Sequence, residues 1–267
     1  MSAMTADRAT GPARRPLPPI PMLRVVSVEI RKMFDTRSGF WLLASIGITS
    51  FLAMAAVIVF APTDLQTFET YATTIGAPVA IILPMIAVLA VTSEWSQRSG
   101  LTTFTLVPGR WRVIAAKGVG TLLVAVVAMV LTIGTGVLGT VVGSSISGTT
   151  TSWETLSVSG SFNTLVAGTV NMAIGFMLGV LIRSSPGAIV AYFVYTLVLP
   201  GAFGALAAFQ VWFRDLQPWV DLNFANTRLY DEQMTGQYWA QLGVAALLWL
   251  VLPLTVGLFL VRRSEVK

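Results

Sequence analysis

The densest polar stretch in the middle of the chain is EWSQRSGLTTFTLVPGRWR, residues 94–112, which lies between two long apolar runs. It mixes charged side chains such as Glu94 and Arg98 with apolar ones such as Phe104. This mixture is typical of a short helix at a surface, and Pro108 with Gly109 would end it. Such a surface could dock a soluble partner. A solvated loop whose cations only set the membrane topology is the alternative.

Side chains for covalent or metal chemistry are scarce. The chain contains no Cys and no His, which removes thiol nucleophiles, imidazole bases and the common zinc and haem ligand sets. Its acidic residues lie only outside the apolar runs, and it has no G-x-x-x-x-G-K-[ST] phosphate-binding loop. A membrane enzyme is therefore disfavoured, and we expect this chain to bind no cofactor or metal itself.

The composition predicts an all-α membrane protein. Of the 267 residues, 55% are hydrophobic and only 11% are charged, against about 25% charged in soluble domains. Six runs provide the roughly 20 apolar residues of a transmembrane helix, at 40–60, 75–92, 119–142, 165–182, 188–212 and 238–261. None contains Asp, Glu, Lys or Arg, whereas ion-coupled transporters usually keep one there. The energy for uphill transport would therefore come from another subunit.

The distribution of charge predicts the orientation of these spans. If the N-terminus lies inside, fifteen of the seventeen Lys and Arg residues fall on the inner side, and only Arg214 and Arg228 fall outside. The acidic residues divide into five inside and seven outside, so the net charges are +10 and −5. The positive-inside rule then predicts that both termini are cytoplasmic. Flanking Trp residues form interfacial belts on both sides, and only Trp249 falls in mid-span.

Two segments precede the first span. Residues 1–21 are rich in Pro and lack periodicity, which predicts a disordered cytoplasmic tail, and residues 22–267 form the membrane domain. The stretch MLRVVSVEIRKMFD then places apolar residues on one helical face and Arg24, Arg31, Lys32 and Asp35 on the other. The apolar face is Leu23, Val26, Ile30, Met33 and Phe34. We expect an interfacial amphipathic helix; an extension of the first span is the alternative.

Prolines within the predicted spans and two long outer segments give further indications of structure. Pro78, Pro84, Pro200 and Pro253 lie within the predicted spans, where proline frees backbone carbonyls and marks either a moving, cavity-lining helix or a static kink. Residues 143–164 are rich in Ser, Thr and Gly and read as a loop. Residues 213–237 mix apolar and polar side chains, which favours short amphipathic helices at the outer surface over a simple polar loop.

Three stretches resemble the permease subunits of ABC type-2 transporters. They are VSVEIRKMFDTRSGFWLL before the first span, SEWSQRSGLTTFTLVPGRWRVIAAK between the second and third, and PWVDLNFAN before the sixth. The resemblance covers nearly all of residues 22–267 and depends on the order of these short motifs around six spans. Gly100 with the Thr pair at 102–103 departs slightly from the Gly-Thr pair that the family often has.

The resemblance implies a transport function. Such permeases work in pairs, as two identical copies or two siblings, with separate cytoplasmic ATPase subunits that bind ATP and Mg²⁺, and most of them export their substrates. By this resemblance the chain lies in a bacterial cytoplasmic membrane, binds no nucleic acid and moves a small or amphipathic substrate. Only three Lys stand against fourteen Arg, and Ala, Gly and Val are frequent, which suggests a high-GC bacterial genome.

The resemblance also assigns residues to three places. The ATPase-coupling segment would contain Glu94, Gln97, Arg98, Gly100, Thr103, Phe104, Pro108 and Arg110. The interfacial helix beside it would contain Glu29, Ile30, Lys32 and Phe34. The translocation path in the second and fifth spans, with the outer helices that cap its exit, would contain Pro84, Pro200, Trp219, Asp221, Asn223 and Asn226. A membrane anchor or assembly factor that transports nothing would share the topology, and it remains the alternative function.

Overall fold

The structure is a computed structural model that describes residues 20–96, 110–148, 157–231 and 233–263. Within these residues the chain is helical without strands, and six helices are long and apolar enough to span a membrane. The predicted all-α fold with six transmembrane helices is therefore confirmed. The predicted tail lies outside the described residues except for Ile20 and Pro21.

The helices run nearly without interruption. The elements up to residue 147 are α1 (Met22–Asp35), α2 (Arg37–Phe60), the short 3₁₀ turn η1 (Thr63–Leu65), α3 (Phe68–Ser96) and α5 (Arg110–Ser147). The later elements are α6 (Val158–Ile182), α7 (Ser185–Phe193), η2 (Val194–Val198), α8 (Leu199–Phe209), α9 (Val211–Val220), α10 (Leu222–Asp231), α11 (Gly236–Ala246), η3 (Leu247–Val251) and α12 (Leu252–Arg263). The six spans are α2, α3, α5, α6, α7 to α8 and α11 to α12.

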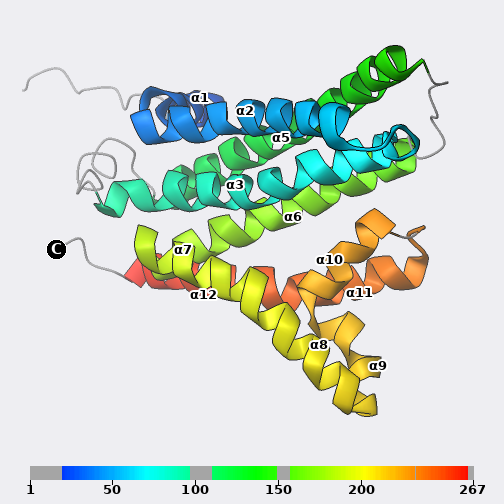
Figure 1. Ribbon diagram of the computed structural model, residues 1–267. Helices are drawn as coiled ribbons and strands as arrows, with labels where there is room; N and C mark the ends of the chain where they lie inside the picture. Colours follow the sequence, from blue (N-terminus) through cyan, green and yellow to red (C-terminus); the bar gives the residue numbers. More distant parts are fainter. Residues whose placement is uncertain (1–19, 97–109, 149–156, 232, 264–267) are drawn as a thin grey trace, which may run out of the picture.

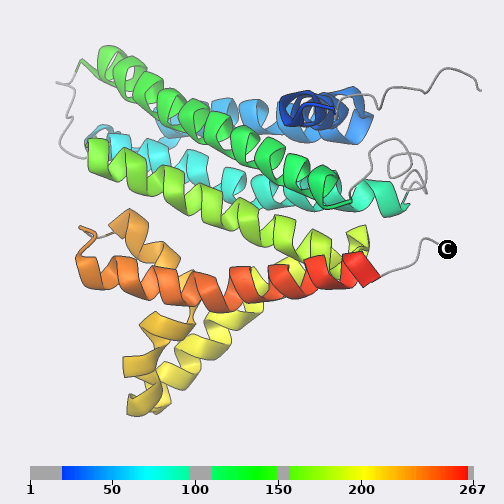
Figure 2. The same ribbon diagram turned by 180° about the vertical axis from the view of Figure 1, so that it is seen from behind.

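The two ends of the bundle differ. Figure 1 places α1, the end of α3, the start of α5 and the end of α12 at the same end of the molecule. We call this the inner end, because the charge distribution predicts that it faces the cytoplasm, and we call the opposite end, with α9 and α10, the outer end. In Figure 2 α1 is seen almost end-on, whereas the spans run across the picture. This crossing direction suits a helix that lies along a membrane surface.

Helix α6 is the centre of the bundle. It contacts α3 and α5 on one side and α7, α10 and α12 on the other (Figures 1 and 2). One close approach is at Gly175, where an added Cβ atom would collide with the backbone of Pro84 in α3. Small residues allow two helix backbones to meet in this way. Gly175 and Gly179, four residues apart in α6, both face α3 and therefore serve packing within the chain.

Prolines at two positions change the helix type. Pro200 and Pro253 each follow a five-residue π-helical segment, η2 and η3. A proline ring clashes with the carbonyl four residues earlier, and a wider π turn moves that carbonyl away. Each predicted span therefore continues through its proline: Ser185–Phe209 and Gly236–Val261 are each long enough to cross the membrane.

The structure corrects two predicted boundaries. Helix α5 extends well beyond the predicted span at 119–142, so that Lys117 lies two turns inside a helix and not in a loop. The predicted loop at 143–164 is helical at both ends, because α5 continues to Ser147 and α6 begins at Val158. Hydroxyls such as those of Ser144 and Ser147 donate to carbonyls three or four residues earlier, which makes them tolerable in a helix.

The contact between α3 and α6 yields a first prediction. Replacing Gly175 with Leu would force a side chain into the backbone of Pro84, and overpacking of this kind costs about 1–3 kcal/mol. We expect a lower midpoint of unfolding in SDS-containing mixed micelles, followed by tryptophan fluorescence. Gly134→Leu is the control, because nothing lies within 4 Å of a Cβ atom at Gly134. Equal stability of the two variants would contradict the account.

Candidate functional site

A large open cavity lies in the outer part of the bundle. Its volume is about 1900 Å³, and it is lined by residues of α3, α5, α6, α7, η2, α8, α9, α10 and α11. The lining runs from Glu69 and Trp239, near the outer ends of α3 and α11, to Tyr192 and Met129 near the middle of their spans. The cavity therefore connects the outer end with the middle of the bundle.

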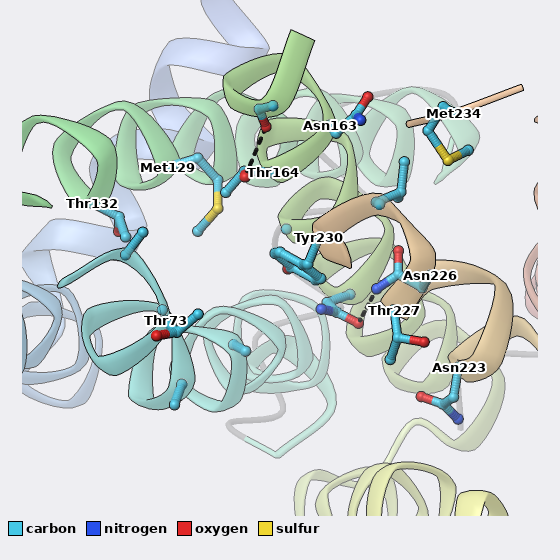
Figure 3. Close-up of a pocket in the computed structure, with 18 of the residues that line it drawn as sticks. Thr73, Met129, Thr132, Asn163, Thr164, Asn223, Asn226, Thr227, Tyr230 and Met234 are labelled. Carbon is cyan, nitrogen blue, oxygen red and sulfur yellow. Dashed lines mark hydrogen bonds between the residues drawn. The ribbon is translucent and has the colours of Figure 1, made fainter. Parts of the chain in front are cut away.

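The two walls of the cavity differ in character. The wall made by α3 and α5 is mostly apolar or small, with Ala72, Gly76, Ala80, Ile81 and Ile133. The wall made by α6 and α10 carries four side-chain amides. They are Asn163, Asn171, Asn223 and Asn226. Figure 3 shows Thr73, Met129 and Thr132 on one side and the residues of α10 on the other.

An amide pair links α6 to α10 in the polar wall. The Nδ2 atom of Asn226 donates to the Oδ1 atom of Asn171 at 3.4 Å (Figure 3). Asn226 is only 7% exposed, and its own Oδ1 atom has no hydrogen-bond partner among the described residues. A buried acceptor without a partner costs about 1–3 kcal/mol, so this wall holds an unused hydrogen-bonding group.

Tyr230 adds a hydroxyl to the same wall. It is 49% exposed because it borders the open cavity. The surrounding protein atoms nevertheless raise the pKa of its phenol to about 12, first by desolvation and second through the nearby Tyr192. The phenol therefore stays neutral at physiological pH and both donates and accepts hydrogen bonds.

Two prolines leave backbone carbonyls beside the cavity without a helical hydrogen-bond donor. Pro84 has no N–H to donate to the carbonyl of Ala80 four residues earlier, and the hydroxyl of Tyr192 donates to that carbonyl at 3.0 Å. In the π turn before Pro200, the N–H of Leu199 bonds to Val194.

The carbonyl of Tyr195 is therefore left without a helical donor, because its π-helical partner would be the N–H that Pro200 lacks. The Nδ2 atom of Asn223 donates to that carbonyl at 3.0 Å. Each proline thus exposes an acceptor that a side chain of another element satisfies.

Asp221 organises the turn between α9 and α10. Its Oδ1 atom accepts a hydrogen bond from the backbone N–H of Phe224, in the first turn of α10, and its Oδ2 atom accepts one from Gln217. Carboxylates favour this position because the first N–H groups of a helix have no partner within the helix. The predicted short helices of the outer segment are confirmed by α9 and α10.

The cavity brings together four of the six residues predicted for the path and its cap. Pro200, Asp221, Asn223 and Asn226 all line it. Pro84 and Trp219 are not among its described lining residues, and Pro84 acts on the cavity indirectly through Ala80 and Tyr192.

A buried ion pair lies near the inner end. Glu29 of α1 and Lys117 of α5 are 2% and 3% exposed, and the Lys117 Nζ atom is 2.5 Å from the Glu29 Oε2 atom. Lys117 also donates to the carbonyl of Ala90 in α3 at 3.0 Å, and Lys32 bonds to the other Glu29 oxygen at 2.7 Å. These contacts join α1, α3 and α5.

Helix α1, predicted to be interfacial, differs from its predicted helical wheel. Its buried residues are Val25, Val26, Glu29 and Met33, whereas Leu23 and Phe34 are exposed. Ile30 is partly buried beside Gly120 of α5, and Lys32 is partly exposed. The acidic side chain lies in the buried face because Lys117, which precedes the span predicted at 119–142 but lies within α5, provides a buried partner.

The predicted coupling segment is mostly outside the described residues. Gln97, Arg98, Gly100, Thr103, Phe104 and Pro108 lie there, whereas Glu94 belongs to the last turns of α3 and Arg110 begins α5. Its assignment stays a prediction. Sequence reasoning missed Lys117, Tyr192 and the Asn171–Asn226 pair. The position of Tyr192 could be found only from the fold, because its acceptor is 112 residues away.

No family model and no curated protein matches the chain. The resemblance to ABC type-2 permeases therefore stays a prediction from the sequence. The fold defines a helical membrane protein with six spans, and the cavity and the buried ion pair are its two candidate functional features.

The proline-freed carbonyl yields a double-variant prediction. Tyr192→Phe removes only the hydroxyl that donates to the Ala80 carbonyl. A buried carbonyl without a donor lowers the free energy of unfolding by about 1–3 kcal/mol. Pro84→Ala restores the missing N–H, so Tyr192→Phe should cost much less in that background. Unfolding in SDS-containing mixed micelles measures the four proteins of this cycle. An equal cost of Tyr192→Phe in both backgrounds would contradict the assignment.

The buried ion pair yields a third prediction. Glu29→Gln leaves the charge of Lys117 buried without its carboxylate, and breaking such a pair costs about 3–5 kcal/mol. Adding Lys117→Met should recover most of the loss. Asp35→Asn is the matched control, because it breaks a pair with Arg31 on the exposed side of the same helix, and exposed pairs contribute about 0–1 kcal/mol. The same unfolding assay applies, and equal losses for Glu29→Gln and Asp35→Asn would refute this role.

Proposed function

We propose that the chain is the membrane subunit of an ATP-driven exporter of the ABC type-2 class. The observation that supports this most is the open cavity of about 1900 Å³ in the outer half of the bundle. A membrane anchor or assembly factor needs no polar opening among its spans, whereas a transport subunit needs one. The described spans also expose many large apolar side chains, as a lipid-facing surface does.

The position of the ionisable residues supports an external energy source. Glu29 and Lys117 neutralise each other near the inner end, and neither is among the described residues that line the cavity. The two carboxylates that do line it, Glu69 and Asp221, lie toward its outer end, whereas a proton relay would continue such groups through the spans. In this proposal the energy comes from a separate cytoplasmic subunit that binds ATP and Mg²⁺, and two membrane subunits, identical or sibling, form the transporter in a bacterial cytoplasmic membrane.

The inner end supports a mechanical connection to such a subunit. The segment at 97–109 joins the end of α3 to the start of α5. The bonds of Lys117 to Glu29 and to the Ala90 carbonyl hold α1, α3 and α5 together two turns from that segment. Because α3 also forms a wall of the cavity, a displacement applied at the inner end would reach the cavity through a continuous helix.

Co-purification tests the proposal. The tagged chain, extracted gently from its own host, should carry a soluble ATPase in stoichiometric amount, identified by mass spectrometry. Glu94→Lys and Arg98→Glu should reduce the recovery of this ATPase at least severalfold while the chain still inserts. Asp64→Lys is the control, because Asp64 is exposed in η1 at the outer end.

Two results would count against the proposal. Absence of an ATPase from a well-folded preparation would favour the anchor or assembly factor. Normal recovery of the ATPase with both charge-reversal variants would remove the coupling role of residues 94–110 but leave the transport function in place.

A further inference from the structure

We infer that the cavity binds amphiphiles whose polar head is uncharged and carries several hydroxyl or amide groups. The inference rests on the proposed function for its biological meaning, since such a molecule would be the cargo. The binding itself requires no ATPase and is therefore testable on this chain alone.

The charges of the lining exclude anionic heads. None of the described residues that line the cavity is Lys or Arg. Of the two lining carboxylates, Asp221 is 2% exposed and already bonded to Gln217 and the Phe224 N–H, while Glu69 is exposed near the mouth. A buried anion requires a positive or hydrogen-bonding partner, and the remaining carboxylate would repel it.

The two walls match the two parts of an amphiphile. The small and apolar residues of α3 and α5 offer a surface for a hydrocarbon body, whereas the amides of α6 and α10 offer donors and acceptors to a polar head. The unused acceptor of Asn226 and the neutral phenol of Tyr230 lie in this second wall. Hydroxyl and amide groups both donate and accept, so they satisfy such a wall without bringing a charge.

The size of the cavity points to a cargo larger than most metabolites. Its volume of about 1900 Å³ exceeds the roughly 300–1,000 Å³ of common small-molecule sites. The space reaches the α3 backbone at Gly76, where nothing lies within 4 Å of an added Cβ atom. A large side chain at this position would occupy the cavity without disturbing the packing of α3.

The test uses two probes with the same decyl chain and different heads. Carbon-14-labelled decyl maltoside has an uncharged, hydroxyl-rich head, and decyl sulfate has an anionic one. Both are titrated below micelle-forming concentrations into polymer-extracted nanodiscs that hold the chain, and the uptake of empty nanodiscs is subtracted. We expect saturable binding of decyl maltoside at least tenfold tighter than that of decyl sulfate.

Variants assign this binding to the cavity. Gly76→Trp should abolish it, whereas Gly134→Trp, at an open and exposed position of α5, should leave it unchanged. The double variant Asn171→Leu with Asn226→Leu removes both partners of the amide pair, so that no lone polar group remains. It should weaken binding about tenfold, which corresponds to ~1.4 kcal/mol.

Three outcomes would overturn the inference. They are no saturable binding of decyl maltoside, equal binding of decyl sulfate, or full binding by Gly76→Trp. Each would leave the co-purification of an ATPase unaffected, so failure of the ligand class and failure of the transport function are distinguishable.

Discussion

Within an apolar bundle, every polar group must find its partner inside the protein, because lipid offers none. In this chain several of these partners are side chains that reach the backbone of another element. Tyr192 of α7 donates to Ala80 of α3, and Asn223 of α10 donates to Tyr195 of η2. The mid-span Trp249 donates from η3 to Val220 at the end of α9, at 2.6 Å. These bonds hold together elements that helix packing alone would leave free to slide.

The same requirement makes the two ends of the molecule different. At the inner end Lys117 satisfies a carboxylate and a carbonyl at once, and α1, α3 and α5 are joined by it. At the outer end the polar groups border an open cavity, and the carbonyls freed by Pro84 and Pro200 are satisfied at its edge. Helices that are bonded to one another at the inner end suit a subunit that receives a displacement there. An open cavity at the outer end suits a subunit that exposes its cargo on that side.

The spans and the outer helices could be predicted from the sequence, because an apolar run of membrane length and an amphipathic stretch such as residues 213–237 are local signals. The partners of the polar residues could not. The sequence places Glu29 in an amphipathic helix, but only the fold shows that its buried partner is Lys117 of α5. The length of α5 depends on Ser and Gly residues that also suit a loop. Pro84 indicates that the carbonyl of Ala80 lacks its helical donor, but only the fold shows that the hydroxyl of Tyr192 donates to that carbonyl.

The absence of cysteine from the chain allows the central claim, that ATP hydrolysis by a partner moves the walls of the cavity, to be measured directly. Spin labels on Thr73→Cys and Thr227→Cys report the distance between the exposed faces of α3 and α10 (Figure 3), and labels on Thr73→Cys and Thr135→Cys report a control distance between α3 and α5. In preparations that retain the ATPase, the account predicts that ATP changes the first distance distribution and leaves the second unchanged. A first distribution that is identical with and without ATP would contradict it.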